Sequence, residues 1–465
     1  MYISPIGGID NGADKASYFQ MKHLVQQGYN VYNVILNDDE KVHTLYQKIG
    51  VKIISVYYTW WNYSEKTDTQ RFQNYQAVEI IVDAIEKFQI DVIISNTFDM
   101  PQGAIAASLT DRPHIWLGHE FPIGDFEWLS DKYAFIKRYA NIILCSSDVL
   151  AEFVTQKIGK QVNYVYPYSE TTAITLISDS SDIEIINVDT LAPLKNQLEL
   201  LVAFKQLKEK GFQGNLRFTA SLSDSNYKVE LLEEVEKMNL ADSVFFNDGS
   251  KKNWEEINRK SIVVQTSRTE TFGLTMIEAL KLGIPLIAAN TASKAMASLG
   301  YLKHDNIYEF GNTNHLVERL EYYLKNYDEV SQSFSKLRTR VIEEQSLEII
   351  TRPLIDAIEN VVGESNPGSE FAEVKKLFVG GAILAQSVLN QQNELIKNEA
   401  SQLKELQDNI NEKQIQLSSQ QNDLEQQKLT ISTLEQQLDY LQKSFFHYCK
   451  WKIKLLLIKF NFKSN

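Results

Sequence analysis

A strand, a helix and a second strand follow one another in one short stretch, and this pattern restricts the fold more than any other. The apolar run 262–264 is typical of a strand, and residues 272–282 are predicted to form a helix. Gly283 and then Pro285 end that helix, as a glycine followed by a proline commonly does. The apolar run 285–289 predicts the next strand. This order indicates a parallel sheet with the helix packed on one face.

Two glutamates stand eight residues apart in this unit. Glu270 lies in the loop at the carboxyl end of the first strand, and Glu278 lies about two turns into the helix. Open parallel sheets bind ligands at that edge, and a helix N-terminus attracts phosphate. Gly273 lets a ligand approach the backbone, and the two carboxylates can accept hydroxyls of a ribose and of a sugar. The alternative is an exposed glutamate before an ordinary surface helix.

The rest of the chain repeats the alternation of strands and helices. Residues 1–165 and 183–345 each predict a doubly wound α/β domain, which is consistent with 465 residues and 43% hydrophobic content. A further helix is predicted at 346–362. A linker or helix covers 363–388, which starts with Gly-Glu-Ser-Asn-Pro-Gly.

A heptad repeat follows the linker. Apolar residues recur every seven positions from Leu389 to Phe445, which predicts a coiled coil over 389–445 and self-association of the chain. Polar residues such as Gln420 and Gln427 occupy the paired positions in the middle and weaken the pairing. The alternative is one long helix packed on the globular part.

Residues 446–465 form a basic aromatic segment. From Tyr440 to Asn465 there are six lysines and no acidic residue, and the lysines alternate with Trp451, Phe460 and a cluster of leucines and isoleucines. Such a segment is typical of a helix in a membrane interface, where each lysine adds about 1 kcal/mol near an anionic leaflet. The alternative is a basic tail that packs on the acidic body.

Composition excludes several other classes. A net charge of −13 argues against nucleic acid as a general partner. The two cysteines, Cys145 and Cys449, lack zinc or disulfide spacing and are consistent with a reducing cytosol. No signal peptide is recognised, and no run reaches the ~18 apolar residues of a membrane span. We therefore expect a cytoplasmic protein, peripheral on the inner face of the cell membrane.

The glutamate segment resembles the E-x7-E motif of retaining GT-B glycosyltransferases of family 4 (GT4, glycosyl transferases group 1). The resemblance implies two Rossmann-like domains with an interdomain cleft, an acceptor-side domain at 1–165, a nucleotide-sugar domain at 183–345, and a helix at 346–362 that crosses back. The matching residues are Ser267, Glu270, Phe272, Gly273, Glu278, Ala279, Gly283 and Pro285.

The resemblance also assigns roles in donor binding. It implies that Glu278 holds the ribose, that Glu270 holds the transferred sugar, and that Lys195 and the backbone near Gly273 and Leu274 hold the diphosphate. Phe272 belongs to the same donor-binding segment. The donor is a UDP-, GDP- or dTDP-linked sugar used as co-substrate, with no other cofactor and no metal.

Two further segments are similar to parts of that family's site. The loop 5–14, with Gly8 and Gly12, resembles the loop that lies over the donor sugar and phosphates, although it lacks G-x-G-x-x-G. His119 follows the strand 114–117 and resembles the family's histidine near the transferred sugar. The alternative for His119 is a hydrogen-bonded structural histidine.

One position departs from the family pattern. The family carries Gly-Arg five or six residues before the lysine, and here Asp189 and Thr190 stand there. A diphosphate leaving group needs positive charge nearby as its bond breaks. Without the arginine, Lys195 and the helix N-terminus must supply more of that stabilisation, or Arg268 must contribute to it.

The resemblance implies a hexosyltransferase-type enzyme (EC 2.4) that moves a sugar to a glycan acceptor with retention. The predicted membrane segment indicates a lipid-linked acceptor, as in bacterial surface polysaccharide or teichoic-type polymer synthesis. The alternative function is a non-catalytic GT-B partner or scaffold subunit of a glycosyltransferase complex.

Overall fold

The computed structural model describes residues 1–8, 12–36, 39–61, 68–122, 124–170, 182–220, 224–248, 254, 260–369, 400–404, 431–444, 446 and 450. The chain divides into two units, residues 1–383 and 384–465. Within the described residues, no helix has the length and apolar character needed to cross a membrane.

The N-terminal domain is built on a seven-stranded sheet in which all neighbouring strands are parallel, in the order β3-β2-β1-β4-β5-β6-β7. Parallel sheets are covered on both faces, and accordingly the central strands are buried throughout. The strands are β1 Tyr2–Ile3, β2 Tyr32–Ile35, β3 Lys52–Ser55, β4 Ile93–Asn96, β5 His114–Gly118, β6 Ile142–Cys145 and β7 Asn163–Tyr164.

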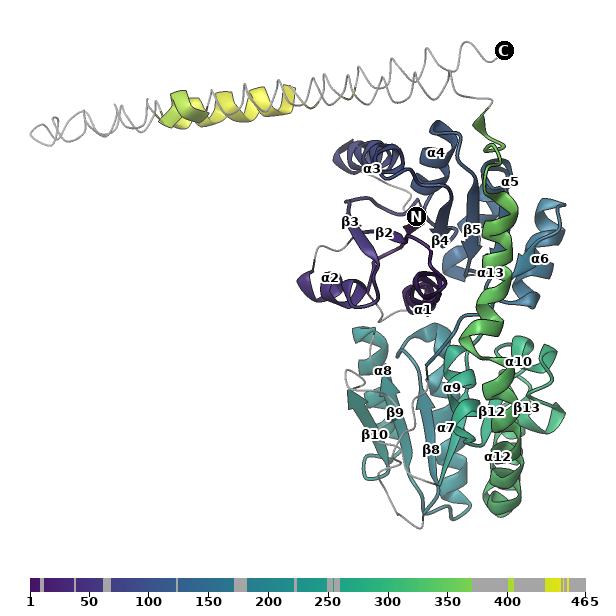
Figure 1. The fold of residues 1–465 in the computed structure, drawn as a ribbon. Coiled ribbons are helices and arrows are strands. Elements are labelled where there is room, and N and C mark those ends of the chain that lie inside the picture. Colours follow the sequence, from purple (N-terminus) through teal and green to yellow (C-terminus); the bar gives the residue numbers. More distant parts are fainter. Residues whose placement is uncertain are drawn as a thin grey trace, which may run out of the picture. The chain divides into compact units, whose positions relative to one another are not determined.

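Helices cover both faces of this sheet (Figure 1). One face packs on α3 and α4. The other face packs on α1 and on α13 (Leu347–Val361), which follows the C-terminal domain in the sequence. The helices are α1 Gly12–Gln26, α2 Glu40–Gln47, α3 Asp68–Lys87, α4 Gln102–Leu109, η1 Gly124–Lys132, α5 Tyr133–Tyr139 and α6 Asp148–Ile158.

The C-terminal domain is built on a six-stranded parallel sheet in the order β10-β9-β8-β11-β12-β13. Its strands are β8 Glu184–Val188, β9 Leu216–Ala220, β10 Val244–Asp248, β11 Ser261–Gln265, β12 Leu286–Ala289 and β13 Ile307–Tyr308. Its helices are η2 Pro193–Lys195, α7 Gln197–Glu209, α8 Ser225–Lys237, α9 Leu274–Leu282, α10 Lys294–Ser298, η3 His304–Asn306, α11 Thr313–Lys325 and α12 Tyr327–Glu344.

Helix α13 (Leu347–Val361) leaves the C-terminal domain and packs on the N-terminal one. Leu354, Ile358 and Val361 join the core beneath α1, and α13 also contacts β6. Figure 1 shows it in green beside the strands of the N-terminal domain. Helix α13 therefore links the C-terminal domain to the N-terminal core by apolar burial.

Strand order reverses once in each sheet. The reversal lies between β1 and β4 in the N-terminal domain and between β8 and β11 in the C-terminal domain. Loops after these strands diverge and leave space at the carboxyl edge, which is where such sheets bind ligands. The segments after β1, β8 and β11 carry Gly8 and Gly12, Lys195 and Glu270 respectively.

In the second unit, residues 400–404 and 431–444 are helical. Most of the predicted coiled coil and nearly all of the basic segment 446–465 lie outside the described residues. Leu438 and Leu441, which occupy apolar heptad positions, are 36% and 58% exposed.

Candidate functional site

The glutamate helix begins two residues later than the sequence predicts. Gly273 adopts a left-handed conformation with φ of +89°, so α9 starts at Leu274 rather than at Phe272. A Cβ at Gly273 would meet only the movable end of the Met276 side chain, so it is the left-handed backbone that favours glycine here. As N-cap, Gly273 offers no side chain to the first amides of α9, which are left for another acceptor.

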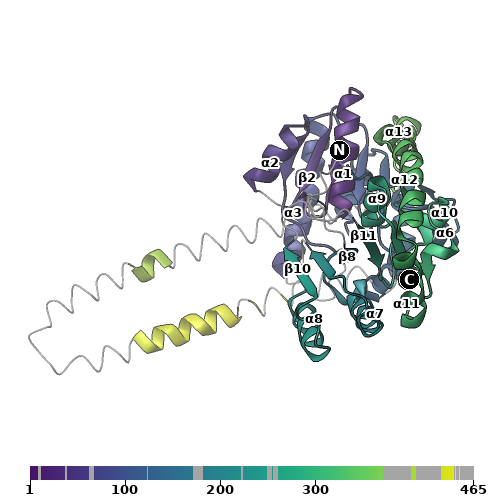
Figure 2. The same cartoon turned by 90° about the horizontal axis from the view of Figure 1, so that it is seen from below.

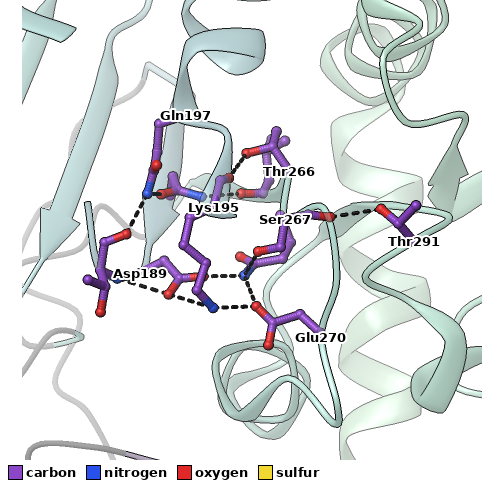
Figure 3. A network of polar contacts seen from close by, with 11 residues as sticks. Asp189, Lys195, Gln197, Thr266, Ser267, Glu270 and Thr291 are labelled. Carbon is purple, nitrogen blue, oxygen red and sulfur yellow. Dashed lines mark hydrogen bonds and ion pairs between the residues drawn. The ribbon is translucent and has the colours of Figure 1, made fainter. Parts of the chain in front are cut away.

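Lys195 lies between two carboxylates (Figure 3). Its ammonium is 3.0 Å from Asp189 Oδ1 and donates a shorter hydrogen bond to Glu270 Oε1. Gln265 donates to Asp189 Oδ2 at 2.5 Å, and Thr266 bonds the Lys195 carbonyl at 2.7 Å. The loops after β8 and β11 are thus joined by one polar network.

Charge in this network is unbalanced, because two carboxylates share one ammonium. Burial lowers the pKa of Lys195, but its pairing with Asp189 and Glu270 outweighs burial and raises that pKa. Burial raises the pKa of Asp189, the Lys195 ammonium lowers it, and the Glu270 carboxylate raises it, with a net increase. An incoming anion meets a lysine whose charge is already used by two partners.

Glu278 lies one turn into α9 and joins three segments of the chain. Its Oε1 is 2.5 Å from the Lys15 ammonium of α1 and accepts a hydrogen bond from Ser169, which lies between the two domains. Its Oε2 accepts from Trp254 Nε1 at 2.8 Å. The carboxylate predicted to hold the ribose is therefore satisfied by the protein's own donors.

The segment around Ser169 is also tied to the end of α9. Lys281 donates to the Ser169 carbonyl at 2.8 Å, and its ammonium lies 4.3 Å from the Tyr168 ring centroid. Burial lowers the pKa of Lys281 to about 8, although the Glu278 carboxylate opposes this.

Two other residues of the predicted donor segment have different surroundings. Phe272 is 2% exposed and its ring stacks on Tyr166, with centroids 5.0 Å apart, so its side chain belongs to the core. Arg268 is exposed, and its backbone amide donates to the Leu194 carbonyl at 2.9 Å. Burial raises the pKa of Tyr227, and the Arg268 guanidinium partly opposes that rise.

The glycine loop comes close to α9 from the other domain. Gly7 has φ of +96° and its amide donates to the buried Asp14 at 3.1 Å, which holds the loop against the start of α1. A Cβ at Gly12 would lie 3.5 Å from Leu274 Cδ1. Gly8 is described and half-buried, and the residues that follow it, 9–11, lie outside the description.

His119 lies just after β5 and is hydrogen-bonded. Its Nε2 lies 2.8 Å from Asn96 Oδ1, and Asn96 Nδ2 donates to the Ala13 carbonyl at 3.1 Å. Burial lowers the pKa of His119 to about 4, so the ring is neutral at neutral pH. Through Asn96, it is linked to the first turn of α1.

Glu120, beside His119, was not singled out by the sequence. Its carboxylate accepts from the backbone amides of Phe98 at 3.2 Å and His119 at 3.0 Å. Burial raises its pKa to about 7, and the hydrogen bonds from these amides only partly oppose that rise.

Lys15, Ser169, Trp254 and the Asp189 carboxylate also escaped sequence reasoning. Lys15 and Glu278 are 263 residues apart, and no local pattern relates them. Asp189 was noted only as a departure from a motif, whereas the structure places its side chain on Lys195. Among the described residues, no group of three or more His, Cys, Asp or Glu side chains is arranged to hold a metal ion.

A protein-family model matches the segment that carries this site. The model of the family described as glycosyl transferases group 1 matches residues 172–345, which include Asp189, Lys195 and both glutamates. No curated protein matches the chain.

Several solved structures share the fold. Anabaena Alr3699/HepE, solved in complex with UDP, is 15% identical with a TM-score of 0.60, over 77% of this chain and 99% of that one. A glycosyltransferase from Rickettsia africae ESF-5 is 14% identical (TM-score 0.63; 78% and 98%). WaaB, a lipopolysaccharide outer core galactosyltransferase, is 13% identical (TM-score 0.56; 77% and 98%). The two parallel-sheet domains therefore have the GT-B fold of these glycosyltransferases.

Proposed function

We propose that this protein is a retaining glycosyltransferase of the GT4 type that moves a sugar from a nucleotide-sugar donor to a glycan acceptor. The observation that carries the proposal is the pairing of Lys195 with Glu270, four residues before the start of α9, at the strand-order reversal of the C-terminal domain, with Glu278 one turn into that helix. HepE, which has the same fold, is described in complex with UDP and with UDP-glucose.

Each group has a defined task in this proposal. Glu278 accepts the ribose hydroxyls, and the first amides of α9 and the Lys195 ammonium hold the diphosphate. Glu270 accepts hydroxyls of the transferred sugar. UDP, GDP and dTDP sugars present the same ribose and diphosphate chemistry, or its deoxyribose form, and no further cofactor or metal is required.

Sugar transfer would then proceed on one face of the donor. The bond between the anomeric carbon and the leaving phosphate breaks as the acceptor oxygen attacks from the same side, and a phosphate oxygen takes the acceptor proton. Lys195 and the α9 N-terminus stabilise the charge that develops on the diphosphate. His119 is neutral and its Nε2–H is held by Asn96 Oδ1, so its Nδ1 is left to accept a hydrogen bond from a sugar hydroxyl.

The second unit would determine where the enzyme meets its acceptor. We propose that residues 389–445 form a coiled coil between copies of the chain, for which the exposed Leu438 and Leu441 are available contacts. Paired chains would present several copies of the basic segment 446–465 to the inner leaflet and gain avidity. A lipid-linked acceptor in surface glycan synthesis is consistent with that placement, and WaaB is described as a lipopolysaccharide enzyme.

One observation favours a second candidate, a non-catalytic GT-B subunit that positions another transferase. Asp189 lies where the family motif has its Gly-Arg pair, and it holds the lysine that a diphosphate would need. The two candidates differ in one respect: an enzyme binds and turns over a nucleotide sugar, whereas a scaffold of this kind does neither.

Replacing Glu278 with alanine tests the proposed donor site. We expect at least one of UDP, GDP and dTDP to bind the wild-type protein, and Glu278→Ala to weaken that binding by about 10- to 100-fold, because a charged acceptor of ribose hydroxyls is removed. Isothermal titration measures this directly. Glu309→Ala, in a loop after β13, is the control and should bind as the wild type does. Equal affinities for the Glu278→Ala and wild-type proteins would contradict the assignment.

Deleting residues 446–465 tests the membrane proposal. The truncated protein should no longer sediment with vesicles that contain phosphatidylserine, whereas the full chain should sediment at low salt and be released at high salt. Neutral phosphatidylcholine vesicles serve as the control surface. Unchanged sedimentation of the truncated protein would show that these residues are not the anchor.

A further inference from the structure

The first turns of helices α1 and α9 lie close together. Gly12 approaches Leu274 at the start of both helices, and Lys15 pairs with Glu278 one turn further along both. Figures 1 and 2 both show α1 next to α9. The positive ends of both helix dipoles therefore meet at one place.

Lys15 brings a full positive charge from the N-terminal domain to this place. Its ammonium is 2.5 Å from Glu278 Oε1, while the rest of that carboxylate is satisfied by Ser169 and Trp254. Lys281, the other ammonium near Glu278, is engaged by the Ser169 carbonyl. Lys15 is thus the cation that a ligand of Glu278 would displace.

The proposed donor leaves Lys15 with a new partner. When ribose hydroxyls occupy Glu278, the diphosphate attached to that ribose lies toward the first turn of α9. Glu278 and Leu274 are separated by about 6 Å of helix rise, which the flexible four-carbon stem of a lysine spans by changing rotamers. A diphosphate there would contact Lys15 from the N-terminal domain and Lys195 from the C-terminal domain. The charge of Lys195 is already shared between two carboxylates.

We propose that Lys15 is a donor-positioning residue that moves from Glu278 to the diphosphate when the nucleotide binds, and so supplies from the N-terminal domain the cation that Thr190 does not. This inference rests on the proposed function and deepens it. It makes donor affinity depend on the N-terminal domain, since the ammonium reaches the phosphate only while α1 lies against α9.

The test compares Lys15→Met with Lys22→Met. Both lysines lie on α1, expose 31% and 30% of their side chains, and pair with a glutamate, Lys15 with Glu278 and Lys22 with Glu170 at 3.8 Å. Titrations would use the tightest binder among UDP, GDP and dTDP, together with its nucleoside. Lys15→Arg keeps the charge and controls for its position.

Lys15→Met should weaken binding of the diphosphate by at least about tenfold, the lower range for losing one charge-assisted contact, and leave nucleoside binding unchanged or tighter. Lys22→Met should match the wild type, and Lys15→Arg should recover most of the affinity. Tighter binding of both ligands by Lys15→Met would mean that Lys15 only blocks the site, and unchanged binding would mean that it takes no part. Either result overturns the inference.

The same titrations separate this inference from the function on which it rests. A wild-type protein that binds none of the three diphosphates contradicts the proposed function itself, and the inference falls with it. A wild-type protein that binds one of them, with Lys15→Met indistinguishable from it, contradicts the inference alone. Thermal unfolding of each variant shows whether loss of the Lys15–Glu278 pair disturbs the fold.

Discussion

Replacing Lys195 with methionine is expected to lower the rate of sugar transfer by about 100- to 1,000-fold, the range found when one group that stabilises developing negative charge is removed. Lys195 is the ammonium that the loops after β8 and β11 hold against Asp189 and Glu270, and Glu270 lies four residues before the start of α9. Release of nucleoside diphosphate from the donor measures the effect. Lys205→Met, which removes a half-buried lysine paired with Glu209 on α7, is the matched control.

Removing Lys195 also leaves Asp189 and Glu270 without their shared cation, so a loss of folding must be separated from a loss of catalysis. The double variant Lys195→Met/Asp189→Asn removes one charge of each sign. It should recover the thermal stability lost by Lys195→Met but not the activity. Recovery of activity in the double variant would contradict the role given to Lys195.

Replacing Asp189 with asparagine is expected to tighten donor binding by about tenfold at neutral pH, because one of the two carboxylates that compete for Lys195 loses its charge. Titration with an intact nucleotide sugar measures this, since its diphosphate does not itself ionise in this range. Asp242→Asn is the control, because Asp242 lies in the exposed turn at the amino end of β10, whereas Asp189 follows the carboxyl end of β8. It should leave donor affinity unchanged. Weaker binding by Asp189→Asn would show that Asp189 supports the donor site.

The titration of Asp189 predicts the direction in which donor affinity changes with pH. Its folded pKa is raised, so protonation favours the folded network, and that contribution is lost as pH rises through the raised pKa. A bound diphosphate raises the pKa further, so donor binding takes up a proton. The affinity of the wild-type protein for the donor should therefore fall as pH rises through the pKa of Asp189. The affinity of the Asp189→Asn variant should change less with pH.

Much of the globular fold could be predicted from local patterns. Short apolar runs marked strands such as β11 and β12, and Gly283 marked the end of α9, where its φ of +75° favours a glycine. The start of α9 was placed two residues early, at Phe272. The left-handed backbone of Gly273 delays the start. Helix α4 was missed because Gln102–Leu109 is apolar on all sides and has no helical periodicity.

The site was harder to predict, because its contacts are not local. The Glu270 and Glu278 spacing located the loop and helix, but nothing near Lys15 relates it to a glutamate 263 residues away. The partners of Lys195 depend on how two loops from different strands meet, and the departure at Asp189 gains its meaning only from that meeting. A sequence motif indicates which residues belong to the site, whereas the folded structure shows how their charges are paired.

The rate at which the purified full-length chain releases nucleoside diphosphate from UDP-, GDP- and dTDP-linked sugars tests the central claim most directly. We predict that one of these donors is turned over, slowly with water and faster with a glycan acceptor, and that the anomeric configuration of the product matches that of the donor. No turnover of any donor, together with no nucleotide-induced rise in melting temperature, would contradict the enzyme and favour the scaffold.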